Sequence, residues 1–213
     1  MQHALPLWKQ FEYFKDYREK LTGFQGKDKA TETLRKALYI ISIGTDDFIL
    51  NYFLFPIRSI EYNDLYNLGA RKISVSGSPP MGCLPAPRNL NIFKGRTCFD
   101  YYNKVSRDFN IELKKLVDKL RKELDGIQVV FSDVYKPMMN MIQNPHLNGL
   151  EEVKRGCCGT GLLEVSYFCM IEAESFLCKD RSIYMYWDSI HATDRVYGIV
   201  ADTLMNTSLR ELI

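Results

Sequence analysis

The sequence lacks the features that mark membrane-spanning and nucleic-acid-binding chains. No segment approaches the roughly 20 consecutive apolar residues that a membrane helix needs. Neither sign of charge dominates, because 28 Lys and Arg residues stand against 26 Asp and Glu residues and leave a net charge of +2. This balance gives no support to nucleic-acid binding. The sequence also has no internal repeat and no low-complexity segment, so we expect a single domain over 1–213.

The start of the sequence lacks the apolar core of a secretory signal. The stretch MQHALPLWKQFEYFKDYREKL carries charges throughout. A chain made as written would therefore stay in the cytoplasm. The six cysteines indicate the opposite, because an even number outside any metal pattern favours disulfides and an oxidising compartment. The conflict suggests that a segment is missing upstream.

A zinc site is the alternative explanation for the cysteines. Cys157 and Cys158 are adjacent, however, with no second pair at ligand spacing, and the three histidines do not cluster with them. We therefore expect no metal and no cofactor. Cys83 is expected to pair with Cys98, because the loop between them is short. The other four cysteines leave three pairings open.

Short β-branched runs alternate with helical patterns along the chain. Strands are expected at 38–43, around Ile73 and Val75, and over 127–131, and the first looks buried on both faces. Helices are expected at 6–21, ended by the glycines at 23 and 26, at 28–37, and at 193–205, with Thr193 as N-cap. The longest apolar stripe at helical spacing comprises Val105, Phe109, Leu113, Leu116, Leu120 and Leu124.

This alternation predicts an α/β fold around a parallel sheet. Ligands of such folds bind beyond the carboxyl ends of the strands. The loops GTDDF, GSPPMGC and WDSIH follow strand-like runs or enter helices, so they are expected to meet at one rim. Residues 144–182 carry four of the cysteines and look irregular, which indicates an excursion within the domain.

The segment YWDSIHATD places Asp188 three residues before His191. A histidine that acts as a general base needs one ring nitrogen toward the nucleophile and the other held by a carboxylate. The alternative is a helix-entry loop with a solvated histidine. No serine here lies in a G-x-S-x-G elbow, and Ser189 is too close in sequence to serve His191.

The segment GTDDF offers a second group of candidates. Gly44 permits close approach of a ligand to the backbone, and Asp46 follows at the same rim. An oxyanion or ligand contact and a simple helix N-cap are both open. An acid–base or metal pair of Asp46 and Asp47 is disfavoured, because adjacent side chains diverge and no third ligand is apparent.

Four blocks of the chain together resemble the plant-type GDSL esterase/lipases of the SGNH hydrolase superfamily. The blocks are ALYIISIGTDDFILNY, LGARKISVSGSPPMGCLP, RGCCGTG and YWDSIHATD, in the order that the family has them. The resemblance implies a three-layer α/β/α sandwich with a parallel, flavodoxin-like sheet. It also implies a Ser-His-Asp triad, hydrolysis of small-molecule carboxylic or acyl-lipid esters, and secretion.

The resemblance assigns roles to four residues of this sequence. Asp188 matches the family's orienting acid, His191 its base and Gly44 its glycine, while Asp46 stands where the family has an oxyanion-hole asparagine. Ala192 replaces the usual proline. The Gly-Asp-Ser-Leu block that carries the nucleophile is absent from these residues, and so is the glycine block that supplies another oxyanion donor.

These departures imply a partial SGNH-hydrolase domain without its N-terminal strands. The run 38–43 would then form an exposed apolar edge, which favours aggregation. Loss of a nucleophilic serine lowers turnover by about 10⁶-fold in a serine protease. We therefore expect a truncated ester hydrolase that is inactive in this form. The alternative is a non-catalytic protein that binds acyl or acetyl ligands, or acts as a decoy.

Overall fold

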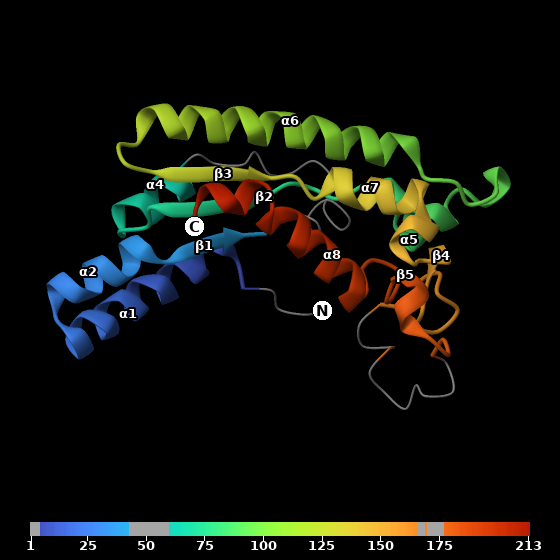
Figure 1. Ribbon diagram of the computed structural model, residues 1–213, viewed down its shortest axis with the longest axis horizontal. Helices are drawn as coiled ribbons and strands as arrows, with labels where there is room; N and C mark the ends of the chain where they lie inside the picture. Colours follow the sequence, from blue (N-terminus) through green and yellow to red (C-terminus); the bar gives the residue numbers. More distant parts are fainter. Residues whose placement is uncertain (1–4, 43–59, 166–168, 170–176) are drawn as a thin grey trace.

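The computed structural model describes residues 5–42, 60–165, 169 and 177–213. Figure 1 shows an elongated arrangement in which helices run alongside a small sheet. The candidates Gly44 and Asp46 fall outside the described residues, so their expected roles stay predictions.

The predicted parallel sheet is confirmed. Its strands are β1 (Leu38–Ile41), β2 (Lys72–Ser76) and β3 (Gln128–Ser132), in the spatial order β1-β2-β3. Both pairings are parallel, and the register places Tyr39 beside Ile73 and Ile73 beside Val129. Parallel neighbours require crossover connections, which the intervening helices supply.

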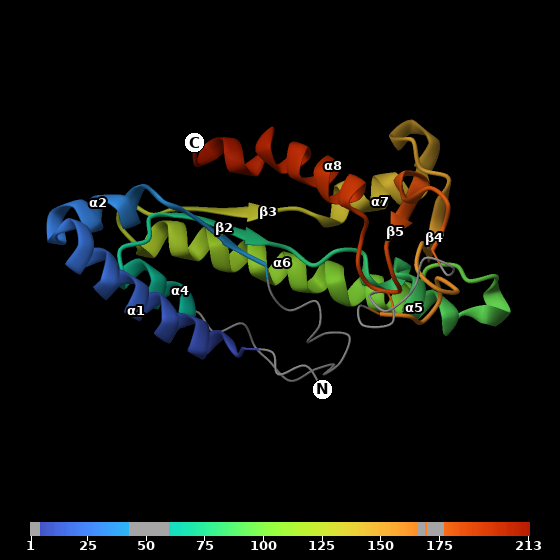
Figure 2. The same cartoon turned by 90° about the horizontal axis from the view of Figure 1, so that it is seen from below.

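One face of this sheet is covered by α1 (Leu7–Gln25), α4 (Ile60–Asn67) and α6 (Asp100–Glu123), as Figure 2 shows. The predicted stripe of α6 is confirmed, because most of its apolar residues belong to the same core cluster as residues of the three strands. Val117, which the spacing missed, is also buried. The core under α6 is formed by Leu65, Ala70, Ile73, Val75, Leu113, Val117, Leu120 and Val129.

The opposite face is covered by α8 (Asp194–Met205) and the 3₁₀ helix η7 (Ser208–Glu211), which completes three layers. Val130 packs there with Leu209 and Leu212. A chain of hydroxyls joins the layers, with 2.8 Å from Ser132 Oγ to the Oγ atoms of both Ser74 and Ser208. These side chains satisfy one another in a buried setting, as buried polar groups must.

Two details of the helices differ from expectation. Gly23 does not end α1, which continues to Gln25 and stops at Gly26, a residue with a left-handed φ of 83°. A single helical glycine costs only about 1 kcal/mol relative to alanine, so it weakens a helix without breaking it. Thr193 does occupy the N-cap position of α8, but its hydroxyl donates to the carbonyl of Tyr184 instead of capping the helix.

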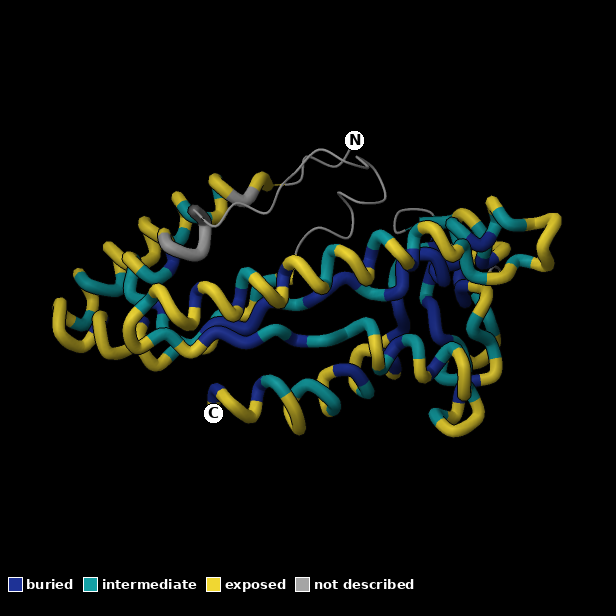
Figure 3. The backbone as a smooth tube through the Cα atoms, turned by 90° about the horizontal axis from the view of Figure 1, so that it is seen from above, coloured by how far each residue is buried: buried dark blue, intermediate teal, exposed yellow. Residues whose placement is uncertain are grey.

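A second sheet lies at the other end of the molecule, with one strand inside the segment 144–182, which is expected to be irregular, and the other just after it. It pairs β4 (Glu152–Gly156) with β5 (Tyr184–Tyr186) in parallel. Figure 3 shows one concentration of buried backbone along the three-stranded sheet and another at this end. The second core comprises Met81, Leu84, Met138, Met141, Leu150, Met185, Tyr186, Ala192, Val196 and Val200.

Shorter elements complete the described chain. The α-helices are α2 (Lys27–Lys36), α5 (Pro85–Asn89) and α7 (Tyr135–Gln143). The 3₁₀ helices are η1 (Met81–Cys83), η2 (Ile92–Lys94), η3 (Pro145–Asn148) and η6 (Arg181–Ile183). Across the described ranges, no helix combines the length and the apolar character needed to cross a bilayer.

The strand β1 is not buried on both faces, contrary to the expectation from its apolar sequence. Its residues alternate, so that Tyr39 and Ile41 meet the core while Ile40 is 62% exposed. The reason is position, because β1 is one of the two terminal strands in the order that the described residues form, and η7 on the opposite face packs against β3, the other terminal strand. The other expectation, of an apolar edge, agrees with this exposure.

We predict that Ile40→Lys raises the soluble fraction of the 213-residue chain, because a charge on an edge strand opposes pairing between copies. Ile73→Lys is the matched control, since it places a charge at a fully buried position of β2 and should lower solubility. Soluble yield and light scattering measure both effects. A wild-type chain that is already a soluble monomer with a cooperative melt would contradict the prediction.

Candidate functional site

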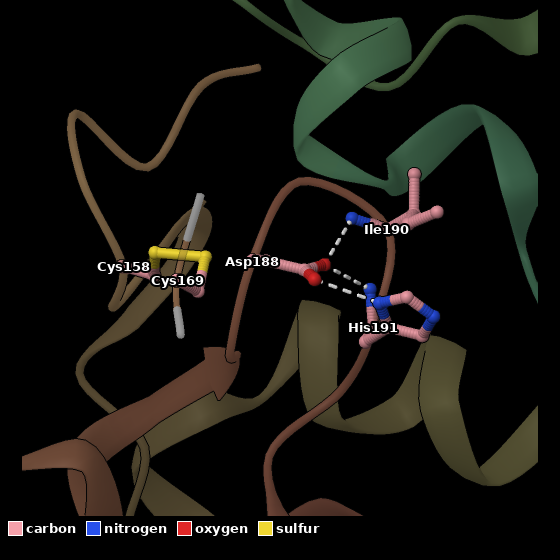
Figure 4. A network of polar contacts seen from close by, with 5 residues as sticks. All are labelled: Cys158, Cys169, Asp188, Ile190 and His191. Atoms are coloured by element: carbon pink, nitrogen blue, oxygen red, sulfur yellow. Dashed lines mark hydrogen bonds and ion pairs between the residues drawn. A yellow bond between two sulfur atoms is a disulfide. The ribbon is translucent and has the colours of Figure 1, made fainter. Parts of the chain in front are cut away.

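Asp188 and His191 lie in direct contact, as their spacing predicts. Asp188 Oδ2 is 2.7 Å from His191 Nδ1. The aspartate is fully buried, whereas the histidine side chain is 43% exposed. Figure 4 shows the second ring nitrogen of His191 on the side away from Asp188. The geometry matches a histidine that is oriented by a carboxylate at one nitrogen.

The turn itself fixes the carboxylate. Asp188 Oδ1 accepts hydrogen bonds from the backbone N–H of Ile190 at 2.9 Å and of His191 at 2.7 Å. A short acidic side chain that bonds to backbone N–H groups two and three residues ahead is a common way to close a turn. The N–H of Trp187 donates to the carbonyl of His191 at 2.8 Å and closes the base of the loop. Asp188 therefore shapes the loop as well as holding the ring.

The RGCCGTG segment lies against this loop. The N–H of Cys157 donates to the carbonyl of Tyr186 at 3.0 Å, and that of Cys158 to the carbonyl of Trp187 at 2.9 Å. Gly156 lies directly against the backbone of Asp188. A Cβ at this position would be only 2.7 to 2.8 Å from that backbone. Only glycine fits there without displacing the loop, since real Cβ contacts are longer.

Three disulfides are formed, and the expectation of disulfides is confirmed. Cys83 pairs with Cys98 as predicted. Of the three open pairings for the rest, the structure has Cys157–Cys178 and Cys158–Cys169. The zinc alternative is wrong for these cysteines. Within the described residues, no cluster of three or more potential His, Cys, Asp or Glu ligands forms a metal site.

Glu164 ties the cysteine-bearing segment to the same loop. Its backbone carbonyl accepts from the N–H of Ser189 at 2.9 Å. Its carboxylate accepts from the N–H and the hydroxyl of Thr160, and from the N–H groups of Leu162 and Leu163. Burial raises the pKa of this carboxyl, but the hydrogen bonds outweigh burial and lower it from 4.5 to about 2.

The loop is held from the other side by α5. The N–H of Ala86 donates to the carbonyl of Ser189 at 3.0 Å. The helix that follows GSPPMGC therefore contacts WDSIH, whereas GTDDF lies outside the described residues, so the expectation that the three loops meet at one rim stays a prediction. Ser189 is fully buried, and its hydroxyl has no hydrogen-bond partner among the described residues. Ser78 is also buried, with its hydroxyl on Ser106.

Sequence reasoning missed Gly156 and Glu164 as supports of the site. The RGCCGTG block resembles a block of the family, but its residues do not reveal which segment of the fold it contacts. A Gly before paired cysteines was the available signal for close backbone approach. The contact with Asp188 depends on the parallel pairing of β4 with β5, which the sequence did not reveal.

The comparisons with known proteins identify the family of the chain. The family described as GDSL-like Lipase/Acylhydrolase matches residues 9–204. Relatives from Arabidopsis thaliana include GDSL esterase/lipase At2g04570, 46% identical over 96% of this chain, and At4g26790, 41% identical over 97%. GDSL esterase/lipase APG is 33% identical over 96%. In each case the match covers 63% of the relative, so the chain spans less than two thirds of these proteins.

We predict that Gly156→Ala lowers the free energy of unfolding by about 1–3 kcal/mol, because the added methyl overpacks against the backbone of Asp188. Gly198→Ala in α8 is the matched control, since its Cβ would meet nothing within 4 Å and alanine favours a helix. Urea unfolding compares the two variants. Equal stability of Gly156→Ala and the wild type would show that this close approach does not exist.

We predict that Glu164→Gln destabilises the protein at neutral pH and that the difference disappears in acid. The folded pKa is lowered, so the contribution of the carboxylate is present above 4.5 and is lost as the pH falls toward about 2. Urea unfolding at a series of pH values from neutral downward measures this window. Glu151→Gln, at an exposed position, is the control. A difference that stays constant with pH would refute the anchoring role of the carboxylate.

Proposed function

Because the chain belongs to the GDSL-like lipase/acylhydrolase family, we propose that it carries the general base and the orienting acid of a serine ester hydrolase. The substrates in this proposal are carboxylic or acyl-lipid esters. The observation that supports it most strongly is the 2.7 Å contact between Asp188 Oδ2 and His191 Nδ1. His146, the other histidine that the structure describes, has no carboxylate contact among the described residues.

In this mechanism, His191 donates its Nδ1–H to Asp188 and keeps the lone pair on Nε2. Nε2 takes the proton from a serine hydroxyl as the oxygen attacks the ester carbonyl, and then gives that proton to the departing alkoxide. A water molecule repeats the cycle on the acyl-enzyme. Asp188 does not take the proton, because its role is to hold the tautomer and to stabilise the imidazolium.

The nucleophile in this proposal lies outside the 213 residues, which contain no Gly-Asp-Ser-Leu sequence. Ser189 is an unsuitable substitute, because its hydroxyl is buried inside the turn that Asp188 closes. Gly44 and Asp46 remain proposed contributors to a degenerate oxyanion hole. An ionised Asp46 would repel the developing negative charge, since oxyanion sites use hydrogen-bond donors. The chain alone is therefore proposed to be inactive.

The disulfides fit an extracellular protein, because thiols stay reduced in the cytosol. We extend the proposal to secretion for this reason. The two disulfides of the cysteine-bearing segment are anchored beside Asp188, so an oxidising compartment would also help to preserve the site.

We predict that the 213-residue chain does not hydrolyse p-nitrophenyl butyrate. The same chain fused behind the Gly-Asp-Ser-Leu-bearing segment of a relative should hydrolyse it. In the fusion, His191→Ala should lower turnover by about 10⁶-fold and Asp188→Asn by about 10⁴-fold, if the triad behaves as in serine proteases. His146→Ala, which alters an exposed histidine, is the matched control. Steady-state kinetics measures all five proteins: the unfused chain, the fusion and its three variants.

Each other outcome has a defined meaning. Turnover by the unfused chain that His191→Ala abolishes would place the nucleophile within these residues and refute its proposed origin. An active fusion that tolerates His191→Ala would refute the role of the base. Saturable binding of butyrate without hydrolysis, in the chain and the fusion alike, would favour a ligand-binding or decoy protein instead.

A further inference from the structure

A loop closed by the disulfide Cys83–Cys98 projects from the end of the molecule that carries α5 (Figure 1). Its outermost residues are large and apolar. Leu90 is 68% exposed, Ile92 is 58% exposed, and Phe93 is fully exposed. Contiguous apolar residues in water usually mark an interaction site, whereas single ones do not.

This exposure is built into the loop. Arg88 is only 3% exposed, and its guanidinium donates from Nε to the carbonyl of Cys83 at 2.7 Å and from Nη1 to the carbonyl of Arg96 at 3.0 Å. One buried side chain thus ties both ends of the loop together. Asn91 Nδ2 donates to the carbonyl of Thr97 at 3.2 Å, which is another hydrogen bond across the loop. The apolar residues are therefore carried by a loop that a disulfide and several hydrogen bonds hold in place.

Positive charge surrounds the apolar residues. Residues 83–98 contain Arg88, Lys94 and Arg96 and no Asp or Glu. Beside them, β4 contributes Lys154 and Arg155, both exposed. A hollow of about 470 Å³ between the loop and β4 is lined by Ile92, Gly95, Arg96, Glu152, Lys154 and Arg155.

The single carboxylate in the hollow does not cancel its charge. Glu152 Oε1 accepts from the backbone N–H groups of Lys154 and Arg155, at 2.7 and 3.2 Å. Three cationic side chains thus face one carboxylate that is already bonded to backbone. The hollow has the size and charge to receive an anionic headgroup while Ile92 lies at its rim.

We propose that this loop, which we call the basic tip (residues 88–96), docks the protein on a lipid surface that carries anionic phospholipids. Phe93, Ile92 and Leu90 enter the boundary between headgroups and acyl chains, while Lys94, Arg96, Lys154 and Arg155 contact phosphates. Interfacial anchors combine apolar burial with basic residues in this way. A protein partner fits less well, because standard interfaces cover about 800 Å² per side and three projecting residues offer far less.

The tip is joined to the candidate site through α5. Asn89 Nδ2 donates to the carbonyl of Leu162, and the N–H of Ala86 donates to the carbonyl of Ser189, inside the turn between Asp188 and His191. Docking through the tip would bring this turn to the lipid surface. The binding itself does not depend on the proposed hydrolysis, so it is tested without turnover.

The test is density-gradient flotation of the 213-residue chain with vesicles of phosphatidylcholine, with and without phosphatidylserine, because vesicle-bound protein floats whereas aggregates sediment. We expect binding to the phosphatidylserine vesicles that weakens as salt is raised. Phe93→Ser should weaken it by roughly tenfold to a hundredfold, because burial of one aromatic side chain is lost. The triple variant Lys94→Gln, Lys154→Gln, Arg155→Gln should weaken it by about fivefold per charge.

Phe24→Ser is the matched control, because Phe24 is also an exposed phenylalanine but lies near the far end of α1. It should bind as the wild type does. Absence of vesicle binding, equal binding to neutral vesicles, or equal losses in Phe93→Ser and Phe24→Ser would each overturn the proposal. A shift of oligomeric state in Phe93→Ser by size-exclusion chromatography, with vesicle binding unchanged, would assign the tip to self-association and also overturn it.

Discussion

A buried carboxylate is costly unless hydrogen-bond donors surround it, and the end of this molecule is organised around one such group. Asp188 is fully buried and meets three nitrogens, the two backbone N–H groups of its own turn and the ring of His191. The two backbone bonds set the turn and the third contact orients the ring. Any displacement of the turn would therefore change the direction of the imidazole.

Three neighbouring segments contact this turn and hold it in place. Gly156 lies against its backbone, Glu164 accepts from Ser189, and α5 donates to Ser189 from the other side. Two disulfides hold the segment that carries Gly156 and Glu164. The proposed pair of Asp188 and His191 would need supports of this kind, because side chains on an unsupported loop lose their geometry.

The parts of the fold that local patterns control could be predicted from the sequence. The runs around Ile73 and Val129 become the buried strands β2 and β3, and the stripe from Phe109 to Leu124 covers them, because burial follows periodicity. The contact of Asp188 with His191 was predictable for a related reason, since three residues in one turn bring the side chains together.

Features that depend on distant segments could not be predicted. The strand β4 is largely polar, and it becomes a strand only because β5 lies beside it. The exposure of Ile40 follows from the position of β1 in the sheet and not from its own residues. The close approach of Gly156 to Asp188 could not be predicted either, since it joins segments more than thirty residues apart. Gly44 and Asp46 remain predictions.

The central claim is that Asp188 fixes the tautomer of His191, and nitrogen NMR of the imidazole tests it most directly. The account predicts that in the neutral ring of His191 the proton is on Nδ1 and not on Nε2, and that Asp188→Asn abolishes this preference. A neutral ring protonated at Nε2 in the wild type, or a tautomer unchanged by Asp188→Asn, would contradict it.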